Sequence, residues 1–428
     1  MKILLIATNQ ADRFMDRMVV RPVPIGLAYL AASVDEERHT LRVLDLMFAD
    51  DAVSQVADAV SEFEPDLIGL SIRNLDNQSS LNPVWNLPAV RDIIDRIRQI
   101  SAAKTLVGGP AFSILPSECM DYVGADLGIA GDAAEAFATL VERLDNGADY
   151  RDIPGIVYRD DANDGQIVVS EGRFTSNFHR SPRLDLLDMR AYNGSGFGVG
   201  VVTKLAQSYY PTPGANYSGD DWRIRDPQEV VDEIRALDDD FGINKVFFID
   251  SGFNIPAEHA KATCRAIIDA GARVRWNSYV RPSEDADAEL MSLMKQSGCS
   301  LALMAEGGRG GEGLDDRLAG LERMADLCRD AGLPFTMNVT FGEPGETKAS
   351  VERKLDFLKR VKSVFAVLRV GTRVLPNTAV AQTALAEGQI ASESELMRPT
   401  FYIEPQVRDW LADHLREAAT DYPRWNLM

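Results

Sequence analysis

Several side chains that can move protons stand at or near the ends of predicted strands in the second half of the chain. Phenol, carboxylate and guanidinium groups can donate, accept or stabilise a proton when they face a reacting molecule. Because the carboxyl ends of parallel strands meet at one rim, we expect these groups to face a common substrate. The predicted catalytic residues are Tyr210, Tyr279, Arg281, Glu306 and Arg373.

The tyrosines of one long loop have a second interpretation. Tyr209, Tyr210 and Tyr217 lie between a predicted strand and a helix that starts at Asp226-Pro227, where Asp is a good N-cap and Pro a good first helical residue. Since protein cores do not tolerate voids, these rings can also simply fill a cavity. We prefer this interpretation for Tyr209 and Tyr210, whose adjacent side chains point in different directions, so the role of Tyr210 stays open.

Glycine and polar residues also follow the predicted strands of the first half. Glycine lets a ligand approach the backbone closely, and helix N-termini attract phosphate, so such loops suit a nucleotide-like ligand. The fingerprint G-x-G-x-x-G is absent after the first strand, which argues against NAD and FAD. The candidate ligand contacts are Arg73, Asn74, Asn77, Gly108, Gly109, Ser113, Gly131 and Asp132.

These loops belong to a repeating strand–helix pattern over residues 1–147. Five short apolar runs, beginning with KILLIAT, alternate with helical patterns that start near Pro24, Ala52, Pro88, Ser113 and Ala133. This alternation predicts an α/β fold with a Rossmann-like, doubly wound parallel sheet. Residues 148–197 are less regular, contain a hairpin pattern, and are interpreted as a connector packed between domains.

A second alternation of strands and helices fills residues 198–385. Its six apolar runs, from GVVTK to VFAVLRVGTRV, predict a partial (β/α)6 TIM-type barrel that is open on one side. Residues 386–428 are predicted to form a helical C-terminal cap, with Trp410 and Trp425 packing on the barrel.

The composition limits the possible partners. The chain has 428 residues, and its 45 basic and 65 acidic residues give a net charge of −20, which argues against nucleic acid or an anionic membrane as partner. It has no run of 18 apolar residues, and its N-terminal apolar run is too short for a signal segment, so we expect a cytoplasmic protein. The cysteines have no metal-ligand spacing and are expected to be reduced and buried: Cys119, Cys264, Cys299 and Cys328.

Phrases in both halves resemble the cobalamin-binding radical SAM protein family. They include PIGLAYLAASV, GLSIRNLDN, SLNPVWNLP, GGPAFSILPSE, GADLGIAGDAAEAF, WRIRDP and MRPTFYIEP. In that family the loop after the first barrel strand reads C-x-x-x-C-x-x-C and holds a [4Fe-4S] cluster through three thiolates. Here those positions fall at Gln207, Pro211 and Gly214, and none offers a thiolate. The resemblance therefore implies a divergent member, and we expect no [4Fe-4S] cluster.

The resemblance also implies a cobalamin between the two domains. Gly108, Gly109, Ser113 and Gly131 would then surround its nucleotide tail, and other family members supply a histidine to cobalt from a D-x-H-x-x-G motif. That motif is missing, and His39 is expected at the surface. By position, Arg73 and Asn74 are the candidates to lie beneath the cobalt, although Arg73 has the alternative role of a salt bridge at the sheet edge.

In the same family the end of the second barrel strand helps to hold the amino acid part of S-adenosylmethionine. Asp250 and Ser251 occupy that place here. For Asp250, a helix N-cap or a structural ion pair is an equally good interpretation.

Three functions are compatible with this frame. Without a cluster, reductive cleavage of S-adenosylmethionine to a radical is not expected. In the first function, bound cobalamin would instead transfer a methyl or alkyl group to a small molecule by two-electron chemistry. S-adenosylmethionine would be the donor if its pocket survives. Alternatively, the barrel does acid–base or Lewis-acid chemistry, such as a rearrangement or cyclisation, with cobalamin as scaffold or as an electrophilic cobalt. The third function is a non-catalytic cobalamin carrier. Because strands and helix starts remain well formed around the lost cysteines, an enzyme is favoured over a carrier, and we predict the first function. The resemblance implies specialised metabolism as its setting, because the family often modifies natural-product precursors.

Overall fold

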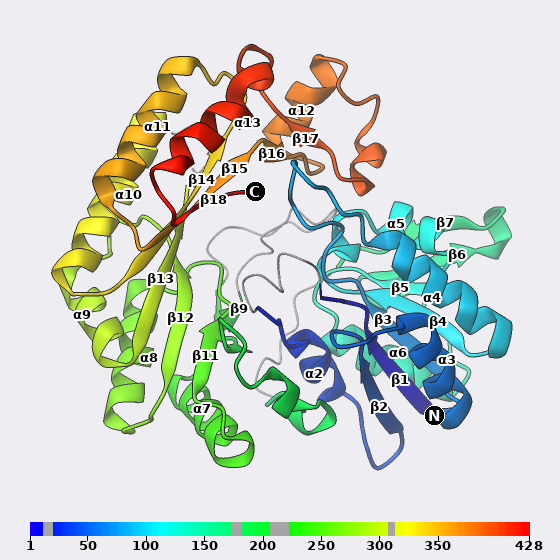
Figure 1. Cartoon of the computed structure of the whole chain (residues 1–428). Helices are drawn as coiled ribbons and strands as arrows, with labels where there is room; N and C mark the ends of the chain where they lie inside the picture. The colour runs from blue at the N-terminus through cyan, green and yellow to red at the C-terminus, as the bar shows by residue number, and fades with distance from the viewer. Residues whose placement is uncertain (12–19, 173–180, 206–221, 307–312) are drawn as a thin grey trace.

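The computed structural model describes residues 1–11, 20–172, 181–205, 222–306 and 313–428. Two lobes lie side by side, each built on its own sheet with helices packed against it (Figure 1). None of the helices in the described ranges combines the length and the apolar character that a membrane span requires.

The first lobe contains a seven-stranded sheet in the order β2-β1-β3-β4-β5-β6-β7. Strands β1 to β5 are parallel, and their interior positions are almost entirely apolar because helices cover both faces. The strands are β1 Lys2–Ala7, β2 Thr40–Asp45, β3 Leu67–Ser71, β4 Lys104–Gly108, β5 Leu127–Ile129, β6 Ile156–Asp160 and β7 Gln166–Val169. The helices are α2 Ile25–Ala31, α3 Ala52–Phe63, α4 Leu87–Ile100, α5 Pro116–Val123 and α6 Ala134–Asp145. The predicted doubly wound α/β sheet is confirmed.

The hairpin of β6 and β7 changes the predicted boundary of this lobe. β6 pairs antiparallel with β5, and β7 pairs antiparallel with β6, so the hairpin extends the first sheet. Residues 156–169 were assigned to a separate connector in the sequence-based prediction, and this assignment is wrong for them. The rest of the connector contains short 3-10 turns at Leu184–Leu186 and Met189–Tyr192.

The second lobe contains a curved, all-parallel sheet in the order β18-β15-β14-β13-β12-β11-β8. Its strands are β8 Val199–Val201, β11 Lys245–Phe248, β12 Arg275–Val280, β13 Cys299–Ala305, β14 Phe335–Phe341, β15 Phe365–Val370 and β18 Trp425–Leu427. The helices are α7 Pro227–Phe241, α8 Ala257–Asp269, α9 Ala288–Gln296, α10 Leu314–Asp330, α11 Lys348–Val361, α12 Ala379–Ala386 and α13 Pro405–Thr420. Two short antiparallel pairs accompany this sheet, β9 Lys204–Leu205 with β10 Arg223–Ile224 and β16 Thr372–Arg373 with β17 Phe401–Tyr402.

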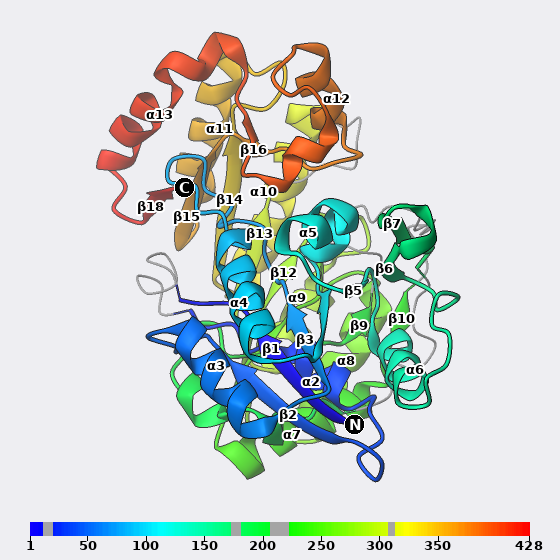
Figure 2. The ribbon, with the colours of Figure 1, turned by 90° about the vertical axis from the view of Figure 1, so that its right-hand side faces the viewer.

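The C-terminal region is more than the predicted helical cap. β18 adds a seventh parallel strand beside β15, so the barrel sheet has one strand more than the six expected. Val374, Ala381, Leu396 and Tyr402 pack into the same hydrophobic core as residues of the first lobe, and the 3-10 turn Glu393–Met397 contacts α5. Figure 2 shows α12 and this turn on the side of the second lobe that faces α5. Trp410 and Trp425 pack against the core of the barrel, as predicted.

Burial alternates along the barrel strands and thereby separates two faces. In β14, Phe335, Met337, Val339 and Phe341 belong to the core beneath the helices, while the residues between them are only half-buried. Because successive side chains of a strand point to opposite faces, Thr336, Asn338 and Thr340 must lie on the concave face. Figure 1 shows α8 to α11 outside the curved sheet and the concave face turned toward the first lobe.

Candidate functional site

The carboxyl ends of the two sheets meet at the junction of the lobes. The side chain of Gln78, after β3, accepts a hydrogen bond from Arg369 of β15 at 3.3 Å, and the Ser80 hydroxyl donates to the carbonyl oxygen of Val370. After β5, Asp132 pairs with Arg223 of β10 at 3.6 Å. Parallel sheets and barrels both receive ligands at the carboxyl ends of their strands, so this junction is the candidate site.

Large apolar side chains remain exposed at these strand ends. Phe48 follows β2, Val84 lies in the loop after β3, Ile249 follows β11, and Tyr279 stands near the end of β12, with exposures of 39–47%. Apolar patches that stay exposed mark ligand or partner sites. The described part of the junction is therefore suited to a ligand with extended apolar surface.

Aromatic rings continue this surface across the barrel. The ring of Phe247 lies 5.5 Å from that of Phe197 and 5.8 Å from that of Tyr279, measured between centroids. Next to Tyr279, Arg281 is exposed, and its backbone is held by Asn254, which accepts from its N–H at 2.9 Å and donates to its carbonyl oxygen at 2.8 Å. Of the five predicted catalytic residues, Tyr279 and Arg281 are thus near each other and exposed, and Tyr210 lies outside the described residues.

Glu306 is not placed with them. Its carboxylate is buried and pairs with Arg317 of α10 at 3.0 Å and with Lys354 of α11 at 3.7 Å. Burial raises the pKa of Glu306, even though both cations oppose the shift. One carboxylate oxygen has no hydrogen-bond partner. These partners lie on two helices outside the sheet, so the placement favours a structural role over contact with a substrate on the concave face.

Arg373 is also engaged by structural partners. Its Nε donates to Asp76 of the first lobe at 2.7 Å, and its terminal nitrogens donate to the carbonyl oxygens of Leu396 at 2.9 Å and Thr400 at 3.4 Å. The guanidinium is therefore committed to the contact between the lobes. This placement favours a positioning role over the predicted catalytic one.

Asp250 is part of a buried ion pair. It accepts from the backbone N–H of Thr203 at 3.0 Å and pairs with Lys204 at 3.3 Å, and both charged side chains are almost fully buried. Lys204 also donates to the carbonyl oxygen of Phe253 at 3.0 Å, and burial lowers the pKa of its ammonium group. This matches the structural alternative for Asp250, while Ser251 beside it is half-buried. The sequence-based prediction missed Lys204. A lysine at the end of an apolar strand pattern is unusual and could have indicated it.

Ser113 connects the loops after β4 and β5. Its hydroxyl donates to the carbonyl oxygen of Gly109 at 3.0 Å and accepts from the N–H of Gly131 at 2.8 Å. Gly109 and Gly131 both have positive φ, and Gly108 lies at the end of β4. The structure therefore brings together four of the residues predicted to surround the nucleotide tail, and Asp132 follows Gly131 directly.

Gly109 should not tolerate a side chain. Its φ is +101°, and an added Cβ would stand 2.7 Å from the carbonyl oxygen of Ile72. We expect Gly109→Ala to lower the free energy of unfolding by about 1–3 kcal/mol, because the strained φ and the contact act together. Gly26→Ala is the control, since nothing lies within 4 Å of its added Cβ and it sits in α2. Urea unfolding in which both variants match the wild type would contradict this expectation.

Arg73 and Asn74 lie just after β3, separated from it by Ile72, at the junction. Arg73 is exposed, and with the Asn74 amide in the orientation that satisfies both groups, the two side chains bond to each other, Asn74 Oδ1 accepting from Arg73 at 3.3 Å. Asn77 is used inside its own loop: it donates to the carbonyl oxygen of Asn82 at 2.9 Å and accepts from the N–H of Val84 at 3.0 Å. Arg73 and Asn74 thus remain the better candidates for ligand contact.

The histidines of the described ranges lie elsewhere. His39 is buried before β2, at the opposite end of the sheet, where it contacts the N-terminal amine at 3.2 Å and Glu142 at 2.9 Å, so its predicted surface position is wrong. His259 contacts the carbonyl oxygen of Thr203 at 3.2 Å, and His414 pairs with Glu352 at 2.8 Å. None of these three follows a strand of the first sheet.

The cysteines do not fit an iron–sulfur cluster at the junction. All four are buried and without disulfides, as predicted, and burial raises the pKa of each thiol. They lie in α5, α8, α10 and at the first residue of β13, the end of that strand opposite the site. Gln207, Pro211 and Gly214, at the family's cluster positions, lie outside the described residues. Within the described ranges, no group of three or more His, Cys, Asp or Glu is arranged to bind a metal ion.

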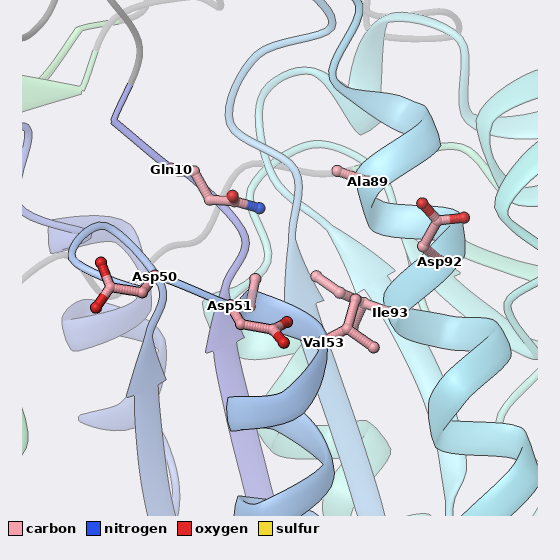
Figure 3. Close-up of a pocket in the computed structure, with 8 residues that line it drawn as sticks. Gln10, Asp50, Asp51, Val53, Ala89, Asp92 and Ile93 are labelled. Carbon is pink, nitrogen blue, oxygen red and sulfur yellow. The ribbon is translucent and has the colours of Figure 1, made fainter.

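A pocket of about 260 Å³ opens at the carboxyl end of β1 (Figure 3). It is lined by Gln10 and by residues at the start of α3 and in the N-terminal half of α4. Three carboxylates are among its lining residues: Asp50, Asp51 and Asp92. Asp51 caps α3 by accepting from the N–H of Ser54 at 3.1 Å. A lining of this charge repels phosphate, so we do not assign the nucleotide tail to it.

Comparison with known proteins places this geometry in context. The family model described as B12 binding domain matches residues 17–141. The chain is 24% identical over 403 residues to the uncharacterized methyltransferase PH0819 of Pyrococcus horikoshii, covering 90% of this chain and 83% of the relative. It is 25% identical over 440 residues to the tryptophan 2-C-methyltransferase of Streptomyces laurentii, covering 85% and 72%.

Two solved structures share the fold over nearly all of this chain. The radical S-adenosylmethionine methyltransferase TsrM from Kitasatospora setae, solved with cobalamin and a [4Fe-4S] cluster bound, superposes with a TM-score of 0.82 at 22% identity, covering 100% of this chain and 93% of TsrM. The cobalamin-dependent S-adenosylmethionine radical enzyme OxsB superposes with a TM-score of 0.72 at 14% identity, covering 98% and 66%. These likenesses establish the fold.

Proposed function

This chain carries a B12-binding domain and is homologous to the cobalamin-dependent radical SAM methyltransferases, and on this premise we propose that it is a cobalamin-dependent methyl or alkyl transferase that works without a [4Fe-4S] cluster. Its substrate is a small molecule, and specialised metabolism is its setting. The observation that carries the second half of the proposal is the set of residues at the cluster positions, Gln207, Pro211 and Gly214. None of them offers the thiolate that iron–sulfur clusters require.

Bound cobalamin would supply methyl-transfer chemistry at its cobalt, with S-adenosylmethionine releasing S-adenosylhomocysteine and the nucleophilic substrate releasing a proton. The chain's own part is to bind, orient and exclude water. The exposed apolar side chains at the facing strand ends fit a large, partly apolar ligand, and the loops of Gly109, Ser113 and Gly131 leave backbone close to it. Arg73 is the candidate to lie beneath the cobalt, and S-adenosylmethionine is the proposed methyl donor.

The substrate would then lie on the concave face of the barrel. Tyr279 and Arg281 are the described candidates to contact it, and Tyr210 is a further candidate from the sequence. Arg281 is a cation at the rim, and it suits a substrate with a carboxylate or phosphate group. Glu306 and Asp250 each pair with a buried lysine, Lys354 and Lys204, and are not proposed to contact the substrate.

The stoichiometry of cofactors tests this proposal. We expect the purified protein to bind about one cobalamin per chain and, after anaerobic incubation with iron and sulfide, to retain no stoichiometric iron, because three thiolates are missing. Absorbance of the corrin and an iron assay measure both. A relative with the intact cysteine triad, treated in parallel, controls the reconstitution. About four iron atoms per chain would overturn the cluster-free mechanism, and a protein without corrin would overturn the cobalamin assignment.

A non-catalytic cobalamin carrier is the second candidate. The observation that favours it is the engagement of Glu306 and Arg373 in ion pairs, which leaves fewer groups for catalysis. Labelled S-adenosylmethionine distinguishes the two functions: transfer of the labelled methyl group to protein-bound, reduced cobalamin is expected of the transferase and not of the carrier.

A further inference from the structure

One loop of the first lobe reaches across to the barrel. It comprises residues 74–86, between β3 and α4, and we call it the docking loop. Its own hydrogen bonds close it: the N–H of Asn86 donates to the carbonyl oxygen of Leu75 at 2.9 Å, and the N–H of Asn77 donates to that of Val84 at 3.2 Å. The loop begins directly after Arg73, so its position fixes where Arg73 and Asn74 stand at the junction.

The docking loop is attached to the second lobe at four points along its length. The contacts are Asp76 with Arg373 at 2.7 Å, Gln78 with Arg369 at 3.3 Å, Ser80 with the carbonyl oxygen of Val370, and the Trp85 ring with the Arg398 guanidinium at 4.7 Å. The first three partners lie within five residues of the chain, at the end of β15 and in β16. The loop is thus held by the carboxyl rim of the barrel.

The ion pair between Asp76 and Arg373 is the buried part of this attachment. The two side chains are 2% and 8% exposed. The second oxygen of Asp76 accepts from the N–H of Gln78 at 2.8 Å, and Arg373 also donates to the carbonyl oxygen of Leu396 at 2.9 Å. The planar Arg373 guanidinium donates to several acceptors at once, and this holds it in one orientation. The ion pair therefore fixes the orientation of the start of the docking loop as well as its distance from the barrel.

We propose that Arg373, through Asp76, is a positioning residue for the cofactor: it holds the docking loop so that Arg73 and Asn74 face the ligand at the junction. The barrel would thereby contribute to cobalamin binding through a residue that need not touch the cofactor. This inference rests on the proposed function. It means that a residue of the second lobe helps to arrange the cobalamin site of the first.

Cobalamin binding by variants of the pair tests this role. We expect Asp76→Asn and Arg373→Gln to raise the Kd for hydroxocobalamin about 10- to 100-fold, the usual effect of losing a group that orients a ligand-contacting residue. Absorbance titration measures the Kd. The electron paramagnetic resonance spectrum of bound cob(II)alamin is the second readout, since it reports the axial environment of cobalt, and we expect it to change. Arg373→Lys keeps the positive charge but lacks the planar guanidinium, so its Kd should lie between those of the wild type and Arg373→Gln.

The matched control is Tyr29→Phe. This variant removes another contact between the lobes, the hydrogen bonds of the Tyr29 hydroxyl with Arg225 at 3.2 Å and Glu233 at 3.3 Å, on the side of α2 and α7. It should leave both readouts at wild-type values. Wild-type Kd and spectra in Asp76→Asn and Arg373→Gln, or equal losses in Tyr29→Phe, would overturn the inference. If the wild-type protein itself binds no cobalamin, the proposed function fails instead.

Discussion

Lys354→Met is expected to lower the free energy of unfolding of the barrel by about 3–5 kcal/mol, as measured by urea denaturation, because it leaves the buried Glu346 carboxylate without its cation and removes one of the two cations beside buried Glu306. The Lys354 ammonium is 1% exposed and lies 2.9 Å from both Glu343 and Glu346 and 3.7 Å from Glu306. It also donates to the carbonyl oxygen of Thr340 at 2.6 Å. Although burial opposes the shift, the three carboxylates raise the pKa of Lys354, so it stays charged at neutral pH.

The matched control for this prediction lies in the same helix. Lys359 is 40% exposed and pairs with Asp356 at 3.0 Å, so Lys359→Met should change stability by less than about 1 kcal/mol. Similar losses of unfolding free energy in the two variants would show that the buried network stabilises the protein no more than an exposed ion pair does. A large loss confined to Lys354→Met would confirm that the network holds the ends of β13 and β14.

Glu233→Ala should be almost as damaging, with an expected loss of about 3–5 kcal/mol, because it leaves the Arg225 guanidinium buried without its carboxylate. Arg225 donates to Glu233 at 2.6 Å and to the carbonyl oxygen of Val202 at 2.8 Å. Burial raises the pKa of Glu233, and Arg225 opposes the shift. Tyr29 of the first lobe is hydrogen-bonded to both Arg225 and Glu233. The loss of stability should therefore appear both when the lobes separate and when the barrel unfolds.

Glu229→Ala tests whether burial is the decisive factor. Glu229 precedes Glu233 by one helical turn and lies 3.9 Å from the same guanidinium, but it is 38% exposed. Its removal should cost less than about 1 kcal/mol. Unfolding monitored by circular dichroism compares the two variants, and a loss in Glu229→Ala as large as that in Glu233→Ala would contradict the argument.

The architecture could be predicted because its signals are local and repeated. Apolar strands alternate with helices whose starts are well marked: Asp226 caps α7 by accepting from the N–H of Gln228 at 2.8 Å, and Thr347 forms a capping box with Ser350 at α11. The three-residue strand β18 gave no such signal, since Trp425–Leu427 is too short for a visible periodicity. Only its pairing with β15 reveals it.

The candidate site could be predicted only as a set of positions. Sequence reasoning correctly placed residues at strand ends, but it could not choose which side of the strand a side chain faces or which distant partner it meets. Glu306 finds Lys354 from α11, Arg373 finds Asp76 from the other lobe, and Asp250 finds Lys204. In each case an opposite charge far along the chain decides the role, and one sequence does not show such pairings.

The attachment of the docking loop also sets an order of events during synthesis. Strands β1 to β5 are complete by Ile129, whereas Asp76 and Arg373 stand 297 positions apart. A ribosome that adds 5–20 residues per second needs roughly 15–60 s to cover that interval. During this time the nascent first sheet can assemble, but its loop lacks its counter-charge. Uptake of a corrinoid that depends on this loop should therefore follow translation of the barrel rather than accompany that of the first sheet.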